Sequence, residues 1–294
     1  MDDRTRGQGQ RTEKLSMTKE KAGFRQFLVL LQRYTELMFN DRQRLFVLLL
    51  QPCLIAVLLY IVADENIFKI YESTKSMLFA LSCSGIWIGL FNSIQEICKE
   101  RTIVKREYMA NLRLSGYVLS KFVFQMALGG LQAVLLTMIF LKLAGNEKEG
   151  IFLDHFSPEM LLTVWLTVLA SISLGFVISA VVKTGDKAMA IAPFVLIIQL
   201  LFSGILFTLE GAGEVISYVT VSRWSVEGLG SIAKLNRLDL KLQADYPMLE
   251  HEAESFFKAT GAHVTQCWGI LIFMTLLFLV VSMISLRRIA KDTR

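Results

Sequence analysis

Six long uncharged stretches constrain this chain more than any other feature of its sequence. Each contains 19 to 23 residues, and roughly 20 helical residues are enough to cross a hydrocarbon core of about 30 Å. Helices are required because lipid cannot satisfy backbone polar groups. The sequence therefore predicts an all-α integral membrane protein with six transmembrane helices. The stretches are residues 45–63, 76–95, 122–141, 160–182, 188–209 and 264–286.

The overall composition agrees with lipid as the solvent. The chain is 53% hydrophobic and 19% charged, against roughly 45–50% and about 25% for soluble domains. Pro52 and Pro193 fall inside the first and fifth stretches. Membrane helices tolerate proline because neighbouring groups satisfy the freed carbonyls, so we expect kinks there and not breaks.

The basic residues predict the orientation. Of the 31 Lys and Arg residues, 22 fall on one side of the predicted membrane. Because cytoplasmic loops retain Lys and Arg, we expect both termini in the cytoplasm. No N-x-[ST] sequon occurs, which favours a bacterial plasma membrane over a eukaryotic cell surface. The same retention explains the net charge of +5, so we expect no nucleic-acid partner.

The segments outside the stretches divide the chain further. Residues 1–22 are polar and lack an apolar core, so we expect a cytoplasmic tail and no signal peptide. Residues 23–42 show apolar side chains at helical spacing, which predicts an amphipathic connecting helix that lies in the inner interface or packs on a partner. Residues 43–294 form the six-helix domain. Within it, 210–263 form an external cap with a re-entrant or interfacial helix over 214–232.

The sequence lacks recognisable catalytic machinery. It has no phosphate-binding G-x-x-x-x-G-K-[ST] loop and no hydrolase or zinc-protease motif, so the chain is not expected to be an enzyme or an ATPase. The four cysteines lie within or beside apolar stretches, and the three histidines lie far apart in predicted external loops. We therefore expect packing and surface roles for them and no metal site. No charge interrupts the stretches, which argues against an ion-coupled carrier.

The loop after the second stretch carries the most informative pattern. It reads E-R-x-x-x-x-R-E-Y over 100–108 and S-G-Y-x-L-S-K over 115–121. Six of the ten residues in 99–108 are charged, with both signs. That composition suits a docking element on the membrane surface, where Arg and carboxylate groups make oriented contacts. An ordinary solvated loop fits the composition equally well.

These patterns resemble the intracellular loop of ATP-binding-cassette (ABC) exporters of the G subfamily (white/pigment type). F-S-G-x-L over 202–206 and the external segment 222–229 resemble the same family, and the resemblance runs from about residue 26 to the C-terminus. It implies that the chain is the permease half of such an exporter. It assigns contact with the ATPase to five charged residues, Glu100, Arg101, Lys105, Arg106 and Glu107.

The resemblance also implies partners. The ATPase usually precedes the permease in one chain of that family, whereas only about 20 residues precede it here. We therefore expect a separate ATPase subunit that binds ATP and magnesium, and no cofactor on this chain. A second copy of this permease or a related one would pair with it among membrane lipids.

By the same resemblance, the substrate path runs between the second and fifth stretches of two permeases. The residues expected to line it are Leu81, Gly85, Ile88, Asn92, Ile197 and Leu200. Ile205 and Leu206 match an apolar external valve, which would close by excluding water. Plain helix packing remains an alternative for the path residues, and lipid contact remains one for the valve.

The expected function is export of a hydrophobic or amphipathic substrate by alternating access, driven by ATP hydrolysis on the partner. Two alternatives stay open. One is a permease for peptide or glycoconjugate secretion. The other is a membrane anchor or immunity protein that does not transport. An adjacent gene for an ATP-binding cassette would favour transport, and its absence would favour the anchor.

Overall fold

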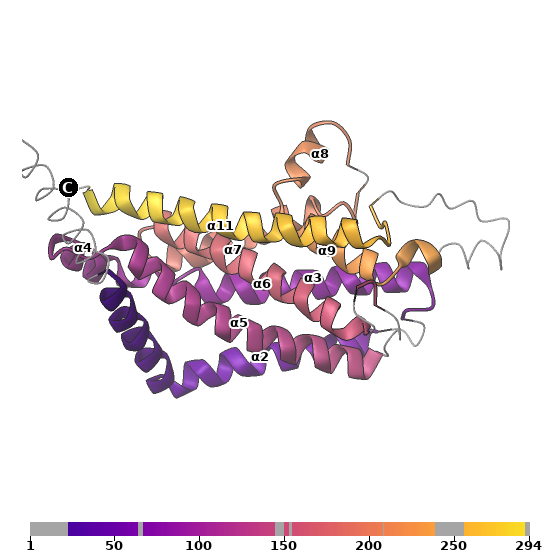
Figure 1. Cartoon of the computed structure of the whole chain (residues 1–294), viewed down its shortest axis with the longest axis horizontal. Helices are drawn as coiled ribbons and strands as arrows, with labels where there is room; N and C mark the ends of the chain where they lie inside the picture. The colour runs from indigo at the N-terminus through magenta and orange to yellow at the C-terminus, as the bar shows by residue number, and fades with distance from the viewer. Residues whose placement is uncertain are drawn as a thin grey trace, which may run out of the picture.

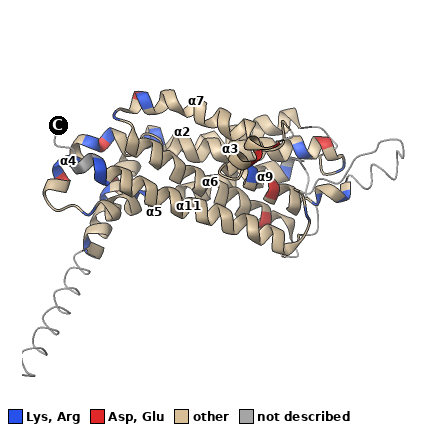
Figure 2. Cartoon of the chain, turned by 90° about the horizontal axis from the view of Figure 1, so that it is seen from above, with Lys and Arg blue, Asp and Glu red and all other residues tan. Residues whose placement is uncertain are grey.

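A computed structural model describes residues 23–63, 67–144, 150–152, 155–207, 209–238 and 256–291 of the chain. Every regular element among these residues is a helix. Five of the helical segments are long and apolar enough to cross a membrane. Figure 2 shows the Lys, Arg, Asp and Glu residues gathered toward the two ends of the bundle, with a mostly uncharged middle. The predicted fold class, an all-α integral membrane protein, is confirmed.

Figure 1 shows how the helices are arranged. A helix over 23–40 comes first. The others are α2 (Arg42–Val62), α3 (Tyr71–Ser93), η1 (Cys98–Glu100), α4 (Arg101–Met109), α5 (Leu114–Ala144), α6 (Phe156–Val181), α7 (Gly185–Leu201), α8 (Ala212–Ser217), α9 (Val221–Ile232) and α11 (Gly261–Lys291). The beginning of the helix 23–40, α4 and the end of α11 lie at the same end of the bundle.

Helix α6 is the centre of the bundle, with α3, α5 and α11 packed around it. Helix α3 can approach α6 closely because two of the residues at their contact are glycines, which have no side chain. A Cβ at Gly89 would lie 2.5 Å from the carbonyl oxygen of Val168. A Cβ at Gly175 would lie 2.1 Å from the hydroxyl of Ser93. Because packing and not apolar burial drives helix association in lipid, these contacts fix α3 against α6.

Helix α7 is shorter than the predicted fifth stretch of 188–209. It has 17 residues and ends at Leu201, and it is not among the five candidate crossings. The chain turns directly afterwards, because Gly204 adopts a φ of +80° and the Ser203 hydroxyl donates to the Leu200 carbonyl at 2.8 Å. The F-S-G sequence therefore ends the helix inside an apolar stretch.

The predicted re-entrant helix over 214–232 is two helices, α8 and α9. The break lies at Thr220, whose hydroxyl donates to the Ser217 carbonyl at 2.7 Å. All residues of α9 are buried, and α9 packs against α3, α6 and α11. The chain thus returns into the bundle after α8. Most of the predicted cap after α9 (residues 239–255) lies outside the described residues, as does the predicted tail 1–22.

The helix 23–40 packs on the bundle along one side only. Tyr34 and Met38 are buried and pack with Leu128 of α5. Phe24 and Val29 are exposed on the same helix. One side of the helix therefore packs on the same chain, and the other carries exposed apolar side chains, as the predicted helix at the membrane interface would.

The α3–α6 contact predicts a difference between two glycine substitutions. Gly89→Ala should destabilise the protein by about 1–3 kcal/mol because the new methyl group has no room. Gly269→Ala on α11 is the matched control, since nothing lies within 4 Å of its Cβ position. The thermal midpoint of the detergent-purified protein measures both. Equal midpoints for the two variants would contradict the close contact.

Candidate coupling site and transport pathway

The charged loop folds as η1 and α4 at the end of α3, and contacts with the helix 23–40 and with the end of α6 hold it. Arg33 of the helix 23–40 pairs with Glu107 at 2.6 Å. The side-chain oxygen of Gln26 accepts a hydrogen bond from the Arg113 backbone at 3.2 Å. Arg101 donates to the Val182 carbonyl at the end of α6, at 3.0 Å. Helix α4 is therefore part of a small assembly and not a loose loop.

Glu100 adds a fourth attachment, to α5. Its Oε2 accepts a hydrogen bond from the Tyr117 hydroxyl at 2.7 Å and pairs with Lys121 at 3.0 Å. Three of the five predicted coupling residues, Glu100, Arg101 and Glu107, are thus engaged within the chain. Their side chains hold α4 against other parts of the chain and are not directed outward.

The other two predicted coupling residues face outward. Among the described residues, neither Lys105 nor Arg106 forms a hydrogen bond or an ion pair, and Arg106 is exposed. Met109, one turn further on, is 73% exposed. We call Lys105, Arg106 and Met109 the α4 outer face. It combines basic groups with an apolar one, which suits contact with another protein.

Next to α4 lies a buried ion cluster that the sequence analysis missed. Glu96 is 4% exposed and Lys121 is 2% exposed. Glu96 pairs with Arg44 of α2, and the Lys121 ammonium donates to the Glu96 backbone carbonyl at 3.0 Å. Both residues immediately flank uncharged stretches (76–95 and 122–141), so a search for charges inside the stretches passed over them. Their position at the stretch ends was the available signal.

Tyr34 connects the ion cluster to the bundle interior. Its hydroxyl donates to Glu96, and the Lys121 ammonium lies 4.4 Å from its ring centroid. Burial, with the nearby negative charge of Glu96, raises the pKa of Tyr34 well above its usual range. The phenol is therefore protonated at neutral pH and acts as a hydrogen-bond donor.

A chain of amide contacts continues from Tyr34. Gln125 donates to the Tyr34 hydroxyl and to the Asn92 carbonyl, both at 3.1 Å. Asn92 donates to Gln132 at 2.5 Å, and Gln132 donates to the Leu48 carbonyl of α2 at 2.8 Å. Polar contacts thus run from the ion cluster beside α4 to the interior faces of α2, α3 and α5.

The predicted pathway stripe on α3 faces the interior of the bundle. Leu81, Gly85, Ile88 and Asn92 are all buried within the single chain. A Cβ at Gly85 would contact the Thr167 methyl of α6 at 3.6 Å. These four positions lie on the side of α3 that packs into the bundle, because its glycines allow the closest approach to α6. They do not line an open surface.

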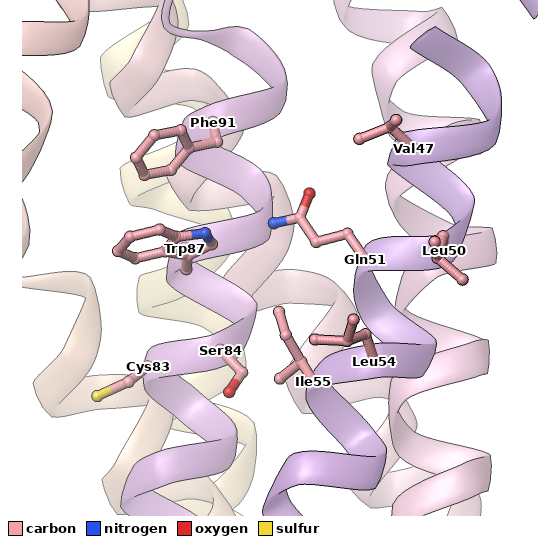
Figure 3. A pocket seen from close by; sticks show the side chains of 9 residues that line it. All are labelled: Val47, Leu50, Gln51, Leu54, Ile55, Cys83, Ser84, Trp87 and Phe91. Atoms are coloured by element: carbon pink, nitrogen blue, oxygen red, sulfur yellow. The ribbon is translucent and has the colours of Figure 1, made fainter. Parts of the chain in front are cut away.

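The opposite side of α3 lines a groove of about 700 Å³ shared with α2 (Figure 3). Trp87 and Phe91 stack at 4.4 Å between ring centroids on one wall. The Gln51 amide points from α2 toward α3. The groove is thus mostly apolar with a few polar groups, as in many ligand sites. Its lining residues are Val47, Leu50, Gln51, Leu54, Ile55, Cys83, Ser84, Trp87 and Phe91.

The remaining predicted residues lie on α7 and after it. Ile197 is 49% exposed, and Leu200 is half-buried. Leu206 is 51% exposed, whereas Ile205 packs partly against the core. Both predicted valve residues follow Gly204 and lie beyond the end of α7. Unlike the α3 stripe, this set includes apolar side chains available to a neighbouring molecule.

Comparisons with known proteins agree with this arrangement. The sequence model of the ABC-2 type transporter family matches residues 25–233. The chain is also 26% identical over 225 residues to an ABC transporter ATP-binding/permease protein of Mycobacterium tuberculosis. That match covers 73% of this chain and 26% of the relative, so the chain spans about a quarter of the relative's length. The chain belongs to the ABC-2 type transporter family, as its membrane-embedded permease component and not its ATPase.

Proposed function

We propose that this chain is the membrane-spanning permease subunit of an ABC exporter, driven by a separate ATP-binding subunit. The α4 outer face carries this proposal. Intramolecular contacts hold α4 at Glu100, Arg101 and Glu107, while Lys105 and Arg106 lack partners among the described residues. A held helix with a free basic face can transmit force from a bound subunit to the bundle.

The proposed ATP-binding subunit supplies all nucleotide chemistry. It binds ATP and magnesium and docks on the α4 outer face in the cytoplasm. The family membership supports this pairing, since ABC-2 permease domains typically work with an ATPase. The distribution of 22 basic residues on one side supports a cytoplasmic position for α4 and for both termini. We place the complex in the plasma membrane of a bacterium.

A second permease, either another copy or a related chain, completes the proposed pathway. The exposed side of α3 and the exposed Ile197 and Phe194 on α7 are apolar and suit this contact. The path then follows the α2–α3 groove and α7. The residues of the α3 stripe pack on the other side of α3, away from the groove. Ile205 and Leu206 of the two permeases close the path toward the outside by apolar contact.

The groove supports a hydrophobic or amphipathic substrate. Its walls are aliphatic and aromatic, and Gln51 and Ser84 supply isolated polar groups. An acyl chain or an aromatic body fits such walls, and a headgroup can hydrogen-bond to the amide. The outward direction of transport rests on the resemblance to G-subfamily exporters.

Reversing charge on the α4 outer face tests the coupling. Arg106→Glu should weaken retention of the co-expressed ATPase subunit by about tenfold, because a charge-assisted contact contributes about 1.5–3 kcal/mol. Arg42→Glu is the control, since Arg42 is also exposed and basic but lies at the start of α2. Retention is measured by co-purification from membranes, and transport in proteoliposomes.

Two results would count against this proposal. Equal retention for Arg106→Glu and the control would remove α4 as the docking site. An intact protein that co-purifies with no ATPase and shows no ATP-dependent transport would favour the membrane-anchor alternative.

The groove predicts a binding defect for one aromatic variant. Trp87→Ala removes a stacked ring from the groove wall, and such pairs contribute about 0.5–1.5 kcal/mol beyond area burial. Binding of a fluorescent phospholipid to the purified complex should weaken by about threefold to tenfold. Phe273→Ala on α11 is the control, because Phe273 is 63% exposed and lies outside the groove. If both variants bind the probe equally, the groove is not the substrate site.

A further inference from the structure

Three metal-binding side chains meet where α9 packs on the beginning of α11. They are Glu227 of α9 and His263 and Cys267 of α11, and their ligand atoms all lie within 4.8 Å of one another. The His263 Nε2 lies 3.1 Å from the Glu227 Oε1. No part of the proposed transport pathway includes these residues.

The local structure brings the three groups together. His263 and Cys267 are four residues apart on α11 and therefore lie on the same side of the helix. Helix α9 lies directly against α11 here, since a Cβ at Gly228 would be in van der Waals contact with the Cys267 Cβ at 3.5 Å. Glu227 and Cys267 are buried, and His263 is half-buried. Solvent access is therefore limited to one side.

Glu227 carries an atom that the protein does not fully satisfy. Its side chain is 9% exposed, yet Oε2 has no hydrogen-bond partner among the described residues. Arg223 lies 3.7 Å from this oxygen, and its guanidinium rests 4.0 Å from the Tyr218 ring centroid. The Arg223 guanidinium is thus close enough to attract this oxygen but too far to donate a hydrogen bond to it. The other oxygen, Oε1, is directed at His263.

We propose that Glu227, His263 and Cys267 bind a zinc ion. Sulfur, imidazole and carboxylate are its usual ligands, and the thiolate disfavours calcium and magnesium. Ligand atoms around tetrahedral zinc stand roughly 3.3–3.6 Å apart, given bonds of about 2.0–2.3 Å, so small side-chain shifts suffice. Binding releases the Cys267 thiol proton to solvent. The thiolate and carboxylate then balance the charge of the ion, and water takes the fourth position.

The proposed ion ties the re-entrant α9 to α11, away from α4. The sequence analysis expected no metal because the three histidines are far apart in sequence. The relevant signal was instead the H-x-x-x-C spacing of His263 and Cys267, which needed Glu227 of another helix to become a site.

Zinc titration of the purified full-length chain tests the proposal. After treatment with a chelator, the protein is titrated with Zn²⁺ against a chromophoric competitor, and with Co²⁺ to detect thiolate-to-cobalt absorption. The ligand variants are Cys267→Ser and His263→Gln. The controls are Cys53→Ser and His155→Gln, which change the same residue types outside the cluster and outside the α2–α3 groove. Size-exclusion chromatography verifies folding of each.

The expected result is one tightly bound zinc ion per chain in the wild type and both controls. Each ligand variant should bind at least tenfold more weakly, since even outer contacts contribute about 10–100-fold in affinity. If Cys267→Ser does not fold, the zinc affinity of His263→Gln and the cobalt spectrum of the wild type test the proposal instead. Equal zinc binding by the wild type and a folded ligand variant, or no thiolate-to-cobalt band in the wild type, would overturn the proposal.

Discussion

The buried ion cluster of Glu96 and Lys121 holds together the parts of this protein that meet at one end of the bundle. Through Glu96 it joins α2 to the end of α3, and through Tyr34 it joins the helix 23–40. Lys121 extends it to Glu100, next to α4. A buried charge left without its partner costs about 3–5 kcal/mol. The cluster is therefore stable only when all of these helices are in place together.

This dependence supports the proposed role of α4 as a coupling element. Lipid gives helices no hydrophobic reason to associate, so polar contacts and close packing must set their positions. The contacts of Glu100, Arg101 and Glu107 attach α4 to α5, α6 and the helix 23–40. In the proposed transporter, a force on the α4 outer face is carried to all three.

The chain of amides from Tyr34 gives that force a route toward the groove. It ends at the carbonyl of Leu48 on α2, and Gln51, three residues further along α2, lines the α2–α3 groove. A shift of the ion cluster would therefore change the position of α2 relative to α3. This links the two ends of the proposed mechanism, docking and substrate binding, through contacts within one chain.

The transmembrane helices were predictable because roughly 20 uncharged residues have few alternatives in lipid. The end of α7 was harder to predict, since Phe202 to Gly204 belong to an apolar stretch and only the backbone turn at Gly204 ends the helix. The predicted path stripe on α3 is buried within the single chain, and the sequence could not indicate this because both sides of that helix are apolar. Gly89, which fits against α6, decides which side is buried.

The candidate coupling site was predictable only in part, because its contacts join residues that are far apart in the sequence. The pattern over 100–108 predicted a docking element with charges of both signs, and the structure places a short helix, α4, at these residues. The pattern could not show that Glu107 pairs with Arg33, 74 residues away, while Arg106 has no such partner among the described residues. Pairings of this kind depend on tertiary structure, which no local pattern contains.

The most direct test is the ratio of substrate transported to ATP hydrolysed in proteoliposomes that contain Tyr34→Phe. This change removes only the hydroxyl between Glu96 and Gln125, and an unsatisfied buried group costs about 1–3 kcal/mol. Our account predicts that the ATPase subunit stays bound and active while transport per ATP falls by about tenfold. Tyr60→Phe, at an exposed position on α2, should change nothing. An unchanged ratio for Tyr34→Phe would contradict coupling through this chain of contacts.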